Sequence, residues 1–294
     1  MVKFQINEEF LGQIELLETV IKNNIAGLFG GNHKSPSFGS SCEFAQHRDY
    51  AEGDDITKID WNAYARFDKL YMKLFLDERQ MHTRIYIDAS RSMEFGDAKK
   101  AEQALKLAAA LAYVSIGDMD KVSIYLMRGR ELISVAENMV GKEAYISLIG
   151  RLNDVEFDGD SYISDAIVPS SVGYGDGLSI IISDFLTDNN YETAIDHLAA
   201  KKRDVFCIQV LADEELEPNA RGKVHFFDSE DQTRFYRKNI NREIARAYKR
   251  ALEYVTGRIR DYCQARGASY LLVPASRPIH EVMFGDLVAG EVLK

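Results

Sequence analysis

The sequence predicts an α/β fold in which helices flank a mostly parallel sheet. From Thr83 onward, short apolar runs typical of buried strands alternate with segments of helical periodicity. Strands that alternate with helices form βαβ units, and such units place neighbouring strands parallel with helices on both faces. The chain has 294 residues, 46% of them hydrophobic, which is enough to bury one large core. We therefore expect a Rossmann-like core over about residues 81–273.

Each element of this core is predicted from its own pattern. Strands are expected where apolar and β-branched residues run together, and helices where apolar residues recur every three or four positions. The predicted strands are Thr83–Asp88, Lys121–Met127, Glu131–Ala136, Leu178–Ser183, Asp204–Leu211 and Ser269–Val273. The predicted helices are Asp97–Ile116, Lys142–Leu152, Ser161–Val168, Tyr191–Ala200 and Ile240–Arg266, and a hairpin is predicted over Lys223–Phe235.

The first part of the chain has a different pattern. Apolar residues recur at helical spacing from about Asn7 to Ala26, which predicts an amphipathic helix. A loop rich in Gly and Ser follows, and the stretch Glu43–Arg79 is dense in charge with aromatic residues between, which favours short strands and turns. We therefore expect two domains: residues 1–80, with the first helix and a small subdomain, and residues 81–294, the α/β domain.

Charge and cysteine content restrict the class of protein. The 36 Lys and Arg against 46 Asp and Glu give a formal net charge of −10, which disfavours binding to nucleic acid or an anionic membrane. The three cysteines are widely spaced and form no Cys-x-x-Cys pair, so no disulfide framework is predicted. No stretch is apolar for long enough to be a transmembrane segment, and no secretory signal begins the sequence. We expect a soluble, cytoplasmic protein.

A group of side chains with hydroxyl and carboxylate oxygens follows the first predicted core strand. It consists of Asp88, Ser90 and Ser92. A second carboxylate, Asp184, follows another apolar strand, and a polar turn with Ser161 lies between the two in the chain. In parallel sheets, ligands bind beyond the carboxyl ends of the strands, where both carboxylates are expected. Because Mg²⁺ and Mn²⁺ prefer hard oxygen ligands, the sequence predicts that these five residues bind one such ion weakly.

A structural alternative exists for the same residues. Ser and Asp are also the ordinary residues of turns and helix N-caps. The side chains of Asp88, Ser90 and Ser92 could therefore cap the helix predicted to begin near Asp97.

The chain order of the proposed ligands resembles the metal-ion-dependent adhesion site (MIDAS) of von Willebrand factor A domains. That site takes its ligands from three loops, with a Thr in the middle loop. This sequence has Ser161 at the middle position, and Ser164 is an alternative counterpart. The resemblance implies a von Willebrand A-like domain whose metal ion binds another protein.

A second and more specific resemblance lies before the first core strand. The dipeptides and tripeptides Glu43-Phe44, Arg48-Asp49-Tyr50, Gly53-Asp54-Asp55, Ile59-Asp60-Trp61 and Ala65-Arg66 occur there in this order. This series resembles the signature of the bacterial domain of unknown function 58 family, which precedes a von Willebrand A-like core. Members commonly sit beside MoxR-type AAA+ ATPases. The resemblance implies a non-enzymatic adaptor that works with such an ATPase or its client in chaperone-like assembly or remodelling.

The charged residues of both terminal regions also have structural alternatives. Arg48 and Arg66 could form ion pairs with acidic residues of the signature, or the segment Gly53–Arg66 could extend the contact with the ATPase. The candidate acidic partners are Asp54, Asp55 and Asp60. The last predicted helix has a basic run that is either a solvated face or a docking site for an acidic partner. This run is Arg242, Arg246, Lys249 and Arg250.

The motifs of common enzymes are missing from the sequence. No phosphate loop of the nucleotide hydrolases and no Gly-x-Ser-x-Gly elbow occurs, and the six His show no paired metal spacing. We therefore expect no catalytic residue. The alternative is a Mg-dependent phosphohydrolase in which Asp88 accepts a phosphoryl group, although that class usually has a second aspartate where this sequence has Ser90.

Overall fold

The structure is a computed structural model of the chain. It describes residues 44–75, 81–97, 99–117, 119–175, 177–186, 190–218, 222–227, 235–240 and 242–283, together with Phe10, Gly12 and Gly285. The chain divides into two compact units, one formed by residues 25–80 and the other by residues 1–24 and 81–294. Apart from Phe10 and Gly12, the predicted first helix and the loop after it lie outside the described residues.

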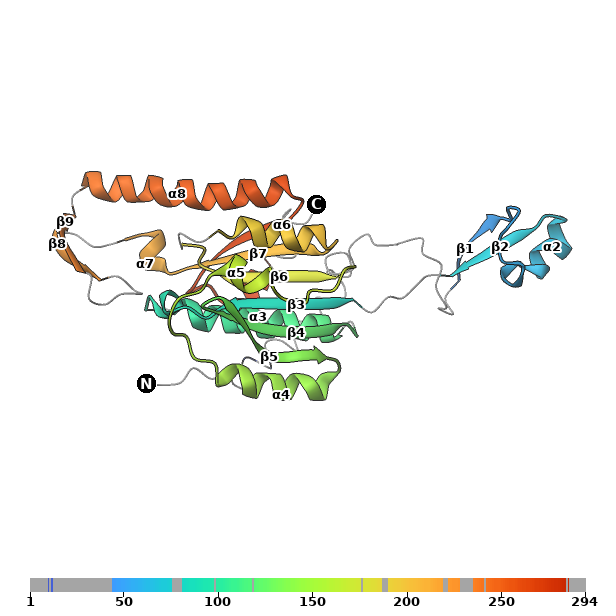
Figure 1. Cartoon of the computed structure of the whole chain (residues 1–294), viewed down its shortest axis with the longest axis horizontal. Helices are drawn as coiled ribbons and strands as arrows, with labels where there is room; N and C mark the ends of the chain where they lie inside the picture. The colour runs from blue at the N-terminus through green and yellow to red at the C-terminus, as the bar shows by residue number, and fades with distance from the viewer. Residues whose placement is uncertain are drawn as a thin grey trace. The chain divides into compact units, whose positions relative to one another are not determined.

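The larger unit is built on a six-stranded sheet (Figure 1). Its strands are β3 (His82–Asp88), β4 (Lys121–Arg128), β5 (Glu131–Met139), β6 (Leu178–Ser183), β7 (Asp204–Leu211) and β10 (Ser269–Pro274). They lie in the order β10-β7-β6-β3-β4-β5, and all neighbours are parallel except β4 and β5. Counted along the chain, this is the doubly wound order 3-2-1-4-5-6. The predicted α/β fold class, a mostly parallel sheet flanked by helices, is confirmed.

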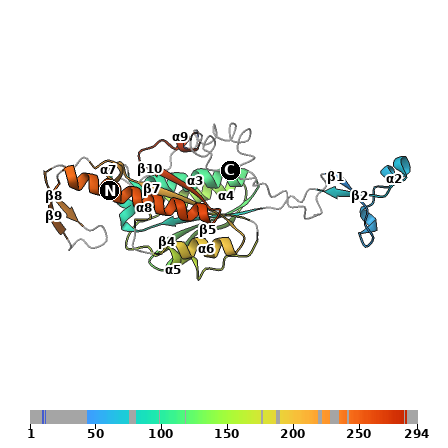
Figure 2. The same cartoon turned by 90° about the horizontal axis from the view of Figure 1, so that it is seen from above.

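Helices cover both faces of this sheet (Figure 2). One face carries α3 (Lys100–Gly117), α4 (Lys142–Asn153) and α9 (Ile279–Glu281), and the other carries α5 (Ile163–Ile167), α6 (Glu192–Ala200) and α8 (Arg242–Ala265). Because strand side chains alternate between faces, Tyr86, Ile181 and Cys207 pack under α5, α6 and α8. Among the described residues, no helix combines the length and the apolar content needed to cross a bilayer.

Most predicted elements are confirmed, with changes at their ends. Strands β6 and β7 have the predicted bounds, and the predicted hairpin is present as β8 (Gly222–Phe227) and β9 (Phe235–Ile240). The 3-10 turn η2 (Arg91–Glu94) was not predicted, and helix α3 begins at Lys100 and not near Asp97, whose N–H donates to Glu214 Oε1. The short helices α7 (Asp213–Leu216) and α9 were not predicted from the sequence.

The end of the larger unit where the parallel strands finish carries additional elements (Figure 1). Helix α7 follows β7 directly, and the hairpin β8–β9 comes next in the chain. Helix α8 ends just before β10 starts, at the opposite edge of the sheet. The first half of α8 therefore lies at the end where the parallel strands finish. The carboxyl edge of the sheet therefore has α7, the hairpin and half of α8 around it.

Over residues 44–75, which the structure describes, the smaller unit has one antiparallel strand pair and two short helical segments. These are β1 (Phe44–Asp49), β2 (Tyr71–Phe75), the 3-10 turn η1 (Ile56–Lys58) and the helix α2 (Trp61–Phe67). Short strands and turns were predicted for this region, and the structure confirms them. Asp55 caps η1 by accepting the Thr57 N–H at 3.0 Å, and Asp60 caps α2 by accepting the N–H groups of Asn62 and Ala63.

The charges of the signature segment form part of the predicted ion network. Arg48 donates to Asp54 at 2.8 Å, as expected for that pair. Asp60 pairs with His47 at 2.8 Å instead of with a predicted Arg. This hydrogen bond is the main reason why the pKa of Asp60 is lowered to about 2. These carboxylates organise the turns of the small unit.

The amino edge of the large sheet contains a pH-sensitive histidine. The Nε2 atom of His82 lies 2.8 Å from Ser123 Oγ. Burial lowers the pKa of His82 to about 4, and the positive charges of Arg84, Arg203 and Lys121 act in the same direction. The usual pKa of 6.5 applies in the unfolded chain, so the unfolded chain binds more protons than the folded one between about pH 6.5 and pH 4. The folded state is therefore destabilised as the pH falls through this window.

We expect His82 to lower the free energy of unfolding by on the order of 1–2 kcal/mol as the pH falls through this window, after allowance for its partial exposure. His82→Gln keeps a polar side chain that does not titrate, so its stability should depend less on pH there. Urea unfolding of both proteins at a series of pH values measures the difference. Parallel stability curves for the two proteins would contradict the prediction.

Candidate functional site

The candidate site lies at the point where the winding of the sheet reverses. Strands β3 and β6 are adjacent and parallel, and the chain continues from them in opposite directions, to β4 on one side and to β7 on the other. In open α/β sheets, ligands bind outside the carboxyl ends of the strands at such a switch point. Asp88 is the last residue of β3, and Asp184 directly follows β6. Both predicted carboxylates therefore lie at the switch point, where their side chains are buried.

Four of the five predicted ligands form one hydrogen-bonded cluster. Asp88 Oδ1 accepts the backbone N–H of Ser90 at 2.9 Å, and the hydroxyl oxygens of Ser90 and Ser92 lie 3.0 Å apart. Ser92 Oγ in turn donates to Asp184 Oδ2 at 2.9 Å. Residues that are far apart in the sequence are thus brought together, and Asp88, Ser90 and Asp184 are buried.

The alternative in which these residues cap the following helix is wrong. Ser90 precedes η2, but its side chain makes no capping hydrogen bond. The hydroxyl of Ser92 is directed to Asp184, and the helix begins only at Lys100. The serine side chains therefore belong to the cluster and not to a helix end.

Ser161 belongs to a loop that runs alongside the first cluster. The N–H of Asp158 donates to the carbonyl of Ala89 at 2.9 Å, and the N–H of Arg91 donates to the carbonyl of Gly159 at 2.8 Å. Ser161 itself is buried and forms an isolated parallel bridge to the residue after β4. These backbone hydrogen bonds hold the Ser161 loop against the residues between Asp88 and Ser92.

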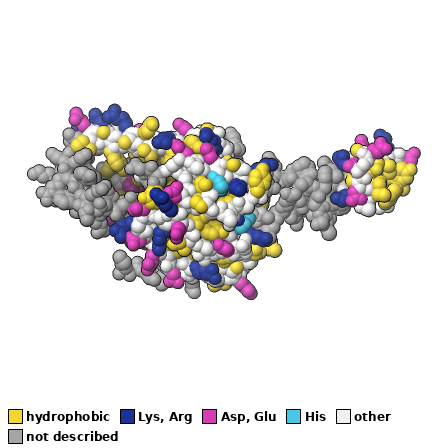
Figure 3. Space-filling model, in the orientation of Figure 1, with side chains coloured by type: hydrophobic (Ala, Val, Ile, Leu, Met, Phe, Trp, Pro, Cys, Tyr) yellow, Lys and Arg dark blue, Asp and Glu magenta, His cyan; other side chains and the backbone are white. Residues whose placement is uncertain are grey.

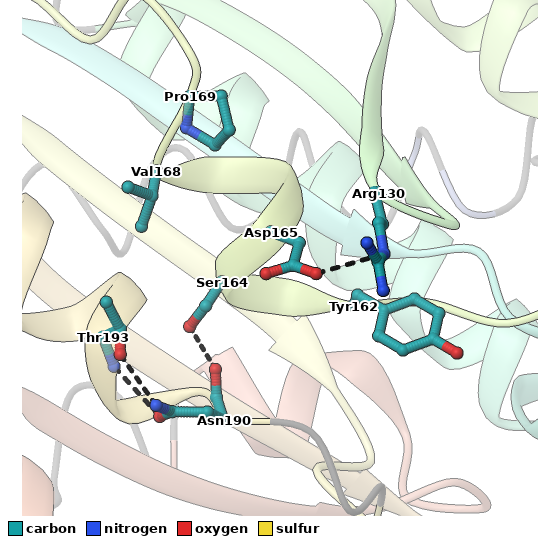
Figure 4. Close-up of a pocket in the computed structure, with 8 residues that line it drawn as sticks. All are labelled: Arg130, Tyr162, Ser164, Asp165, Val168, Pro169, Asn190 and Thr193. Atoms are coloured by element: carbon teal, nitrogen blue, oxygen red, sulfur yellow. Dashed lines mark hydrogen bonds and ion pairs between the residues drawn. The ribbon is translucent and has the colours of Figure 1, made fainter.

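Ser164, the alternative middle-loop residue, has a structural role (Figure 4). Its hydroxyl donates to the carbonyl of Asn190 and accepts the N–H of Ala194 at 3.0 Å, which ties α5 to the start of α6. The pocket drawn in Figure 4 lies beside this contact and is lined by Arg130, Tyr162, Ser164, Asp165, Val168, Pro169, Asn190 and Thr193. That pocket includes neither Asp88 nor Asp184. The hydroxyl of Ser164 is therefore committed to α6, and Ser161 is the better candidate.

Asp88 is a buried carboxylate whose hydrogen-bond donors are neutral. Ser183 Oγ donates to its Oδ2 at 2.5 Å, and the Ser90 N–H donates to its Oδ1. Burial raises the pKa of Asp88, and the negative charge of Asp184 raises it further. A buried negative charge is costly unless a cation or several donors stabilise it. A divalent cation therefore fits this position.

Sequence analysis missed two charged members of the cluster, Lys100 and Glu215. The side chain of Lys100 is 1% exposed, and its Nζ donates to Asp184 Oδ2 at 2.7 Å and to Glu215 Oε1 at 2.8 Å. Burial lowers the pKa of Lys100, but the charges of Asp184 and Glu215 outweigh burial and raise the pKa above its ordinary value. Lys100 is thus a buried ammonium group at neutral pH.

One sequence signal could have found Lys100. It lies at helical spacing from Ala104, Leu107 and Leu111, which are all fully buried on α3. A Lys on the apolar face of a helix needs a buried anion close to it. No comparable signal exists for Glu215, because α7 is too short to show a periodicity.

The loop after β6 is held by a buried network. Gln209 Nε2 donates to the carbonyl of Asp184 at 2.6 Å, and the Tyr270 hydroxyl donates to Gln209 Oε1 at 2.5 Å. The next residue, Phe185, has φ of 51°, a left-handed conformation that costs roughly 1–2 kcal/mol for a residue other than Gly. Backbone strain of this kind occurs preferentially at functional sites, where the surroundings hold it in place. Asp184 is therefore fixed by groups on both sides.

The donor set of the site is chemically specific. No group of three His, Cys, Asp or Glu side chains forms a metal centre anywhere in the described part of the chain. The predicted set offers two carboxylates and three hydroxyls, which are hard oxygen donors suited to Mg²⁺ or Mn²⁺. Since Lys100 already neutralises one carboxylate, we expect a weak site.

Comparison with protein families and curated proteins gives two results. The family model described as "Protein of unknown function DUF58" matches residues 46–255. The uncharacterized proteins Mb1516 of Mycobacterium bovis and Rv1480 of Mycobacterium tuberculosis are each 25% identical to the chain over 223 residues, which are 74% of this chain and 70% of theirs.

The solved structures to which the chain is similar include two whose own chains are covered almost completely. One is an aerotolerance-related membrane protein from Bacteroides fragilis, with 16% identity and a TM-score of 0.43 over 72% of this chain and 98% of that chain. The other is the SpRpn10 VWA domain, with 9% identity and a TM-score of 0.41 over 73% of this chain and 97% of that chain.

Proposed function

The chain belongs to the DUF58 family, and from the geometry of its candidate site we propose that it is a non-enzymatic, metal-dependent protein-binding adaptor. One observation carries the proposal. Asp88, Ser90, Ser92 and Asp184 form a single hydrogen-bonded cluster at the switch point of the sheet, and the Ser161 loop is held beside it. Clustered oxygen donors at such an edge are suited to bind a small hard cation.

Each residue of the cluster has a defined part in this proposal. The ligands would be Asp88, Ser90, Ser92, Ser161 and Asp184, holding one Mg²⁺ or Mn²⁺. When bound, the ion supplies an electrophilic centre to which a carboxylate of another protein can coordinate. Three of these five ligands are neutral hydroxyls, and hard divalent ions prefer oxygen donors, so an acidic side chain is the favoured further ligand from the partner.

The surfaces around the site also support a protein partner. The basic side chains of α8 are exposed, and in Figure 3 dark blue side chains gather along the outer edge of its first half. These residues are Arg242, Arg246, Lys249 and Arg250. They lie at the same end of the unit as the metal cluster, so an acidic partner would be attracted to both.

The small unit offers an apolar surface of its own. Trp61 and Phe67 of α2 are 61% and 65% exposed, and Ile56 of η1 is 63% exposed. Large exposed aromatic groups of this kind are typical of surfaces that bind other proteins. We propose that the partner is a MoxR-type AAA+ ATPase or its client, as the family resemblance implies. The segment Gly53–Arg66 is proposed to contribute to binding of this partner.

The phosphohydrolase alternative has weaker support. Asp88 lies at a strand end near a proposed metal ion, as that reaction requires. However, its side chain is fully buried, whereas a phosphoester from solution must reach the attacking carboxylate. Ser90 also stands where the second aspartate of that class is expected. Release of phosphate from p-nitrophenyl phosphate that depends on Asp88 would support the enzyme over the adaptor.

Calorimetric titration with MgCl₂ and MnCl₂ tests the proposed metal site. We expect the wild-type protein to bind one ion, and Asp88→Asn, which keeps the size of the side chain, to weaken binding by roughly tenfold or more. Ser161→Ala should also weaken it. Ser164→Ala is the matched control, because it removes a hydroxyl of the same segment that is directed to Asn190. Equal heats from wild type and Asp88→Asn would refute the site.

A further inference from the structure

The cluster contains its own cation, and that cation contacts one of the proposed metal ligands. Lys100 Nζ and Ser92 Oγ both donate to the same atom, Asp184 Oδ2, at 2.7 Å and 2.9 Å. The ammonium group is therefore next to the serine hydroxyls at which the divalent ion is proposed to bind. We infer that Lys100 competes with the divalent ion for Asp184 and thereby sets the metal affinity of the site. The inference rests on the proposed function.

The electrostatics favour competition over coexistence. A divalent ion among Asp88, Ser90 and Ser92 would lie close to a buried ammonium group, and like charges repel strongly where water is excluded. Asp184 cannot fully neutralise both cations at once. Binding of the metal ion therefore requires Lys100 to weaken or lose its contact with Asp184.

Glu215 makes such an exchange feasible. It is the second carboxylate partner of Lys100, at 2.8 Å, so the ammonium group remains paired when the metal ion takes Asp184. Glu215 is itself fixed, because its Oε2 accepts the N–H of Ala212 at 2.8 Å. The neighbouring Glu214 accepts the N–H of Asp97 at 2.9 Å, which anchors α7 at the start of α3. Lys100 and Glu215 are thus positioning residues for the site, and neither is proposed to touch the partner.

A purely structural role for the same ion pairs predicts a different outcome. In that case Lys100 only links α3 to α7 and to β6, and its loss would lower stability without changing the affinity for metal. The two explanations differ in the dissociation constant for the ion, which a structural link does not affect.

Three variants separate these explanations in calorimetric titrations of the metal-free protein with MgCl₂ and MnCl₂. Lys100→Met/Glu215→Gln removes one positive and one negative group, so the formal charge of the site stays that of wild type. We expect it to bind the ion about tenfold more tightly or better. Lys100→Met alone should also bind more tightly, and Glu215→Gln alone should bind more weakly, because Lys100 then has only Asp184 as its carboxylate partner.

Stability measurements give a second readout. Lys100→Met leaves the buried Asp184 and the partly buried Glu215 without their cation. We therefore expect low stability in EDTA and recovery in excess Mg²⁺, since an ion that binds only the folded state stabilises it. If this variant does not fold, the charge-matched double variant decides the question. A dissociation constant equal to that of wild type in the double variant would overturn the inference while leaving the metal site intact. Absence of binding heat in wild type and in every variant would instead mean that the proposed function itself has failed.

Discussion

Replacing Arg203 with Met is expected to lower the free energy of unfolding by about 3–5 kcal/mol. The guanidinium group is buried and donates to Ser179 Oγ at 2.6 Å, to the carbonyl of Leu178 at 2.7 Å and to the carbonyl of His82 at 2.5 Å. These acceptors lie at the amino ends of β6 and β3, the central strands of the sheet. Met would leave all three without this donor, and each buried polar group that loses its partner costs about 1–3 kcal/mol.

Equilibrium unfolding in urea checks this prediction, with two matched variants. Ser179→Ala removes only one of the three acceptors and should cost about 1 kcal/mol. Arg203→Lys keeps the charge but loses the planar fork of donors, so it should recover only part of the loss. An effect of Arg203→Met no larger than that of Ser179→Ala would contradict the argument.

The contact between Arg203 and the carbonyl of His82 also explains why residue 177 is a glycine. A Cβ atom at Gly177 would lie 2.7 Å from the carbonyl oxygen of His82 and 2.7 Å from a guanidinium nitrogen of Arg203. The first of these neighbours is backbone and cannot move away easily. Gly177 therefore permits the close approach of β6, β3 and the guanidinium group at this edge.

The fold was predictable where a local pattern fixes the structure. Strands β6 and β7 are mostly apolar and buried on both faces, and the predicted bounds Leu178–Ser183 and Asp204–Leu211 are those of the structure. The start of α3 was misplaced by about three residues, and the N–H of Asp97 donates to Glu214, which comes from α7. A sequence pattern does not show such a long-range contact.

The candidate site was predictable only where strand patterns position its residues. Asp88 and Asp184 could be placed together because parallel strands end at the same edge of a sheet. Lys100 and Glu215 come from the starts of two helices, and they meet only because α7 packs beside α3. Ser183 was assigned to a strand by its position, but its hydroxyl donates to Asp88 on the neighbouring strand. Those contacts depend on the assembled fold.

We expect binding of the partner to depend on the hydroxyl groups of the site. If the partner coordinates the bound ion through an acidic side chain, Ser90→Ala/Ser92→Ala removes two ligands of that ion at the centre of the contact. The affinity for a purified MoxR-type ATPase in Mg²⁺ should then fall by about a hundredfold or more, because residues at the centre of a contact contribute most of its binding energy. A hundredfold loss of affinity corresponds to roughly 2.8 kcal/mol. Binding kinetics, measured with one protein immobilised on a sensor surface, give the dissociation constant and the rate constants of association and dissociation.

The choice of variants makes this measurement specific for the metal cluster. The ATPase also needs Mg²⁺ for its nucleotide, so EDTA alone would not separate an effect on the site from an effect on the ATPase. The serine variants are compared at constant Mg²⁺, and Ser164→Ala serves as the control that keeps the site intact. Reversal of charge at Arg246 and Lys249 should mainly slow association, because exposed charges steer encounter more than they hold the complex. If the serine variants bind the ATPase as wild type does, the contact does not use the metal cluster, and a pull-down from the native cell should then be used to search for another acidic partner.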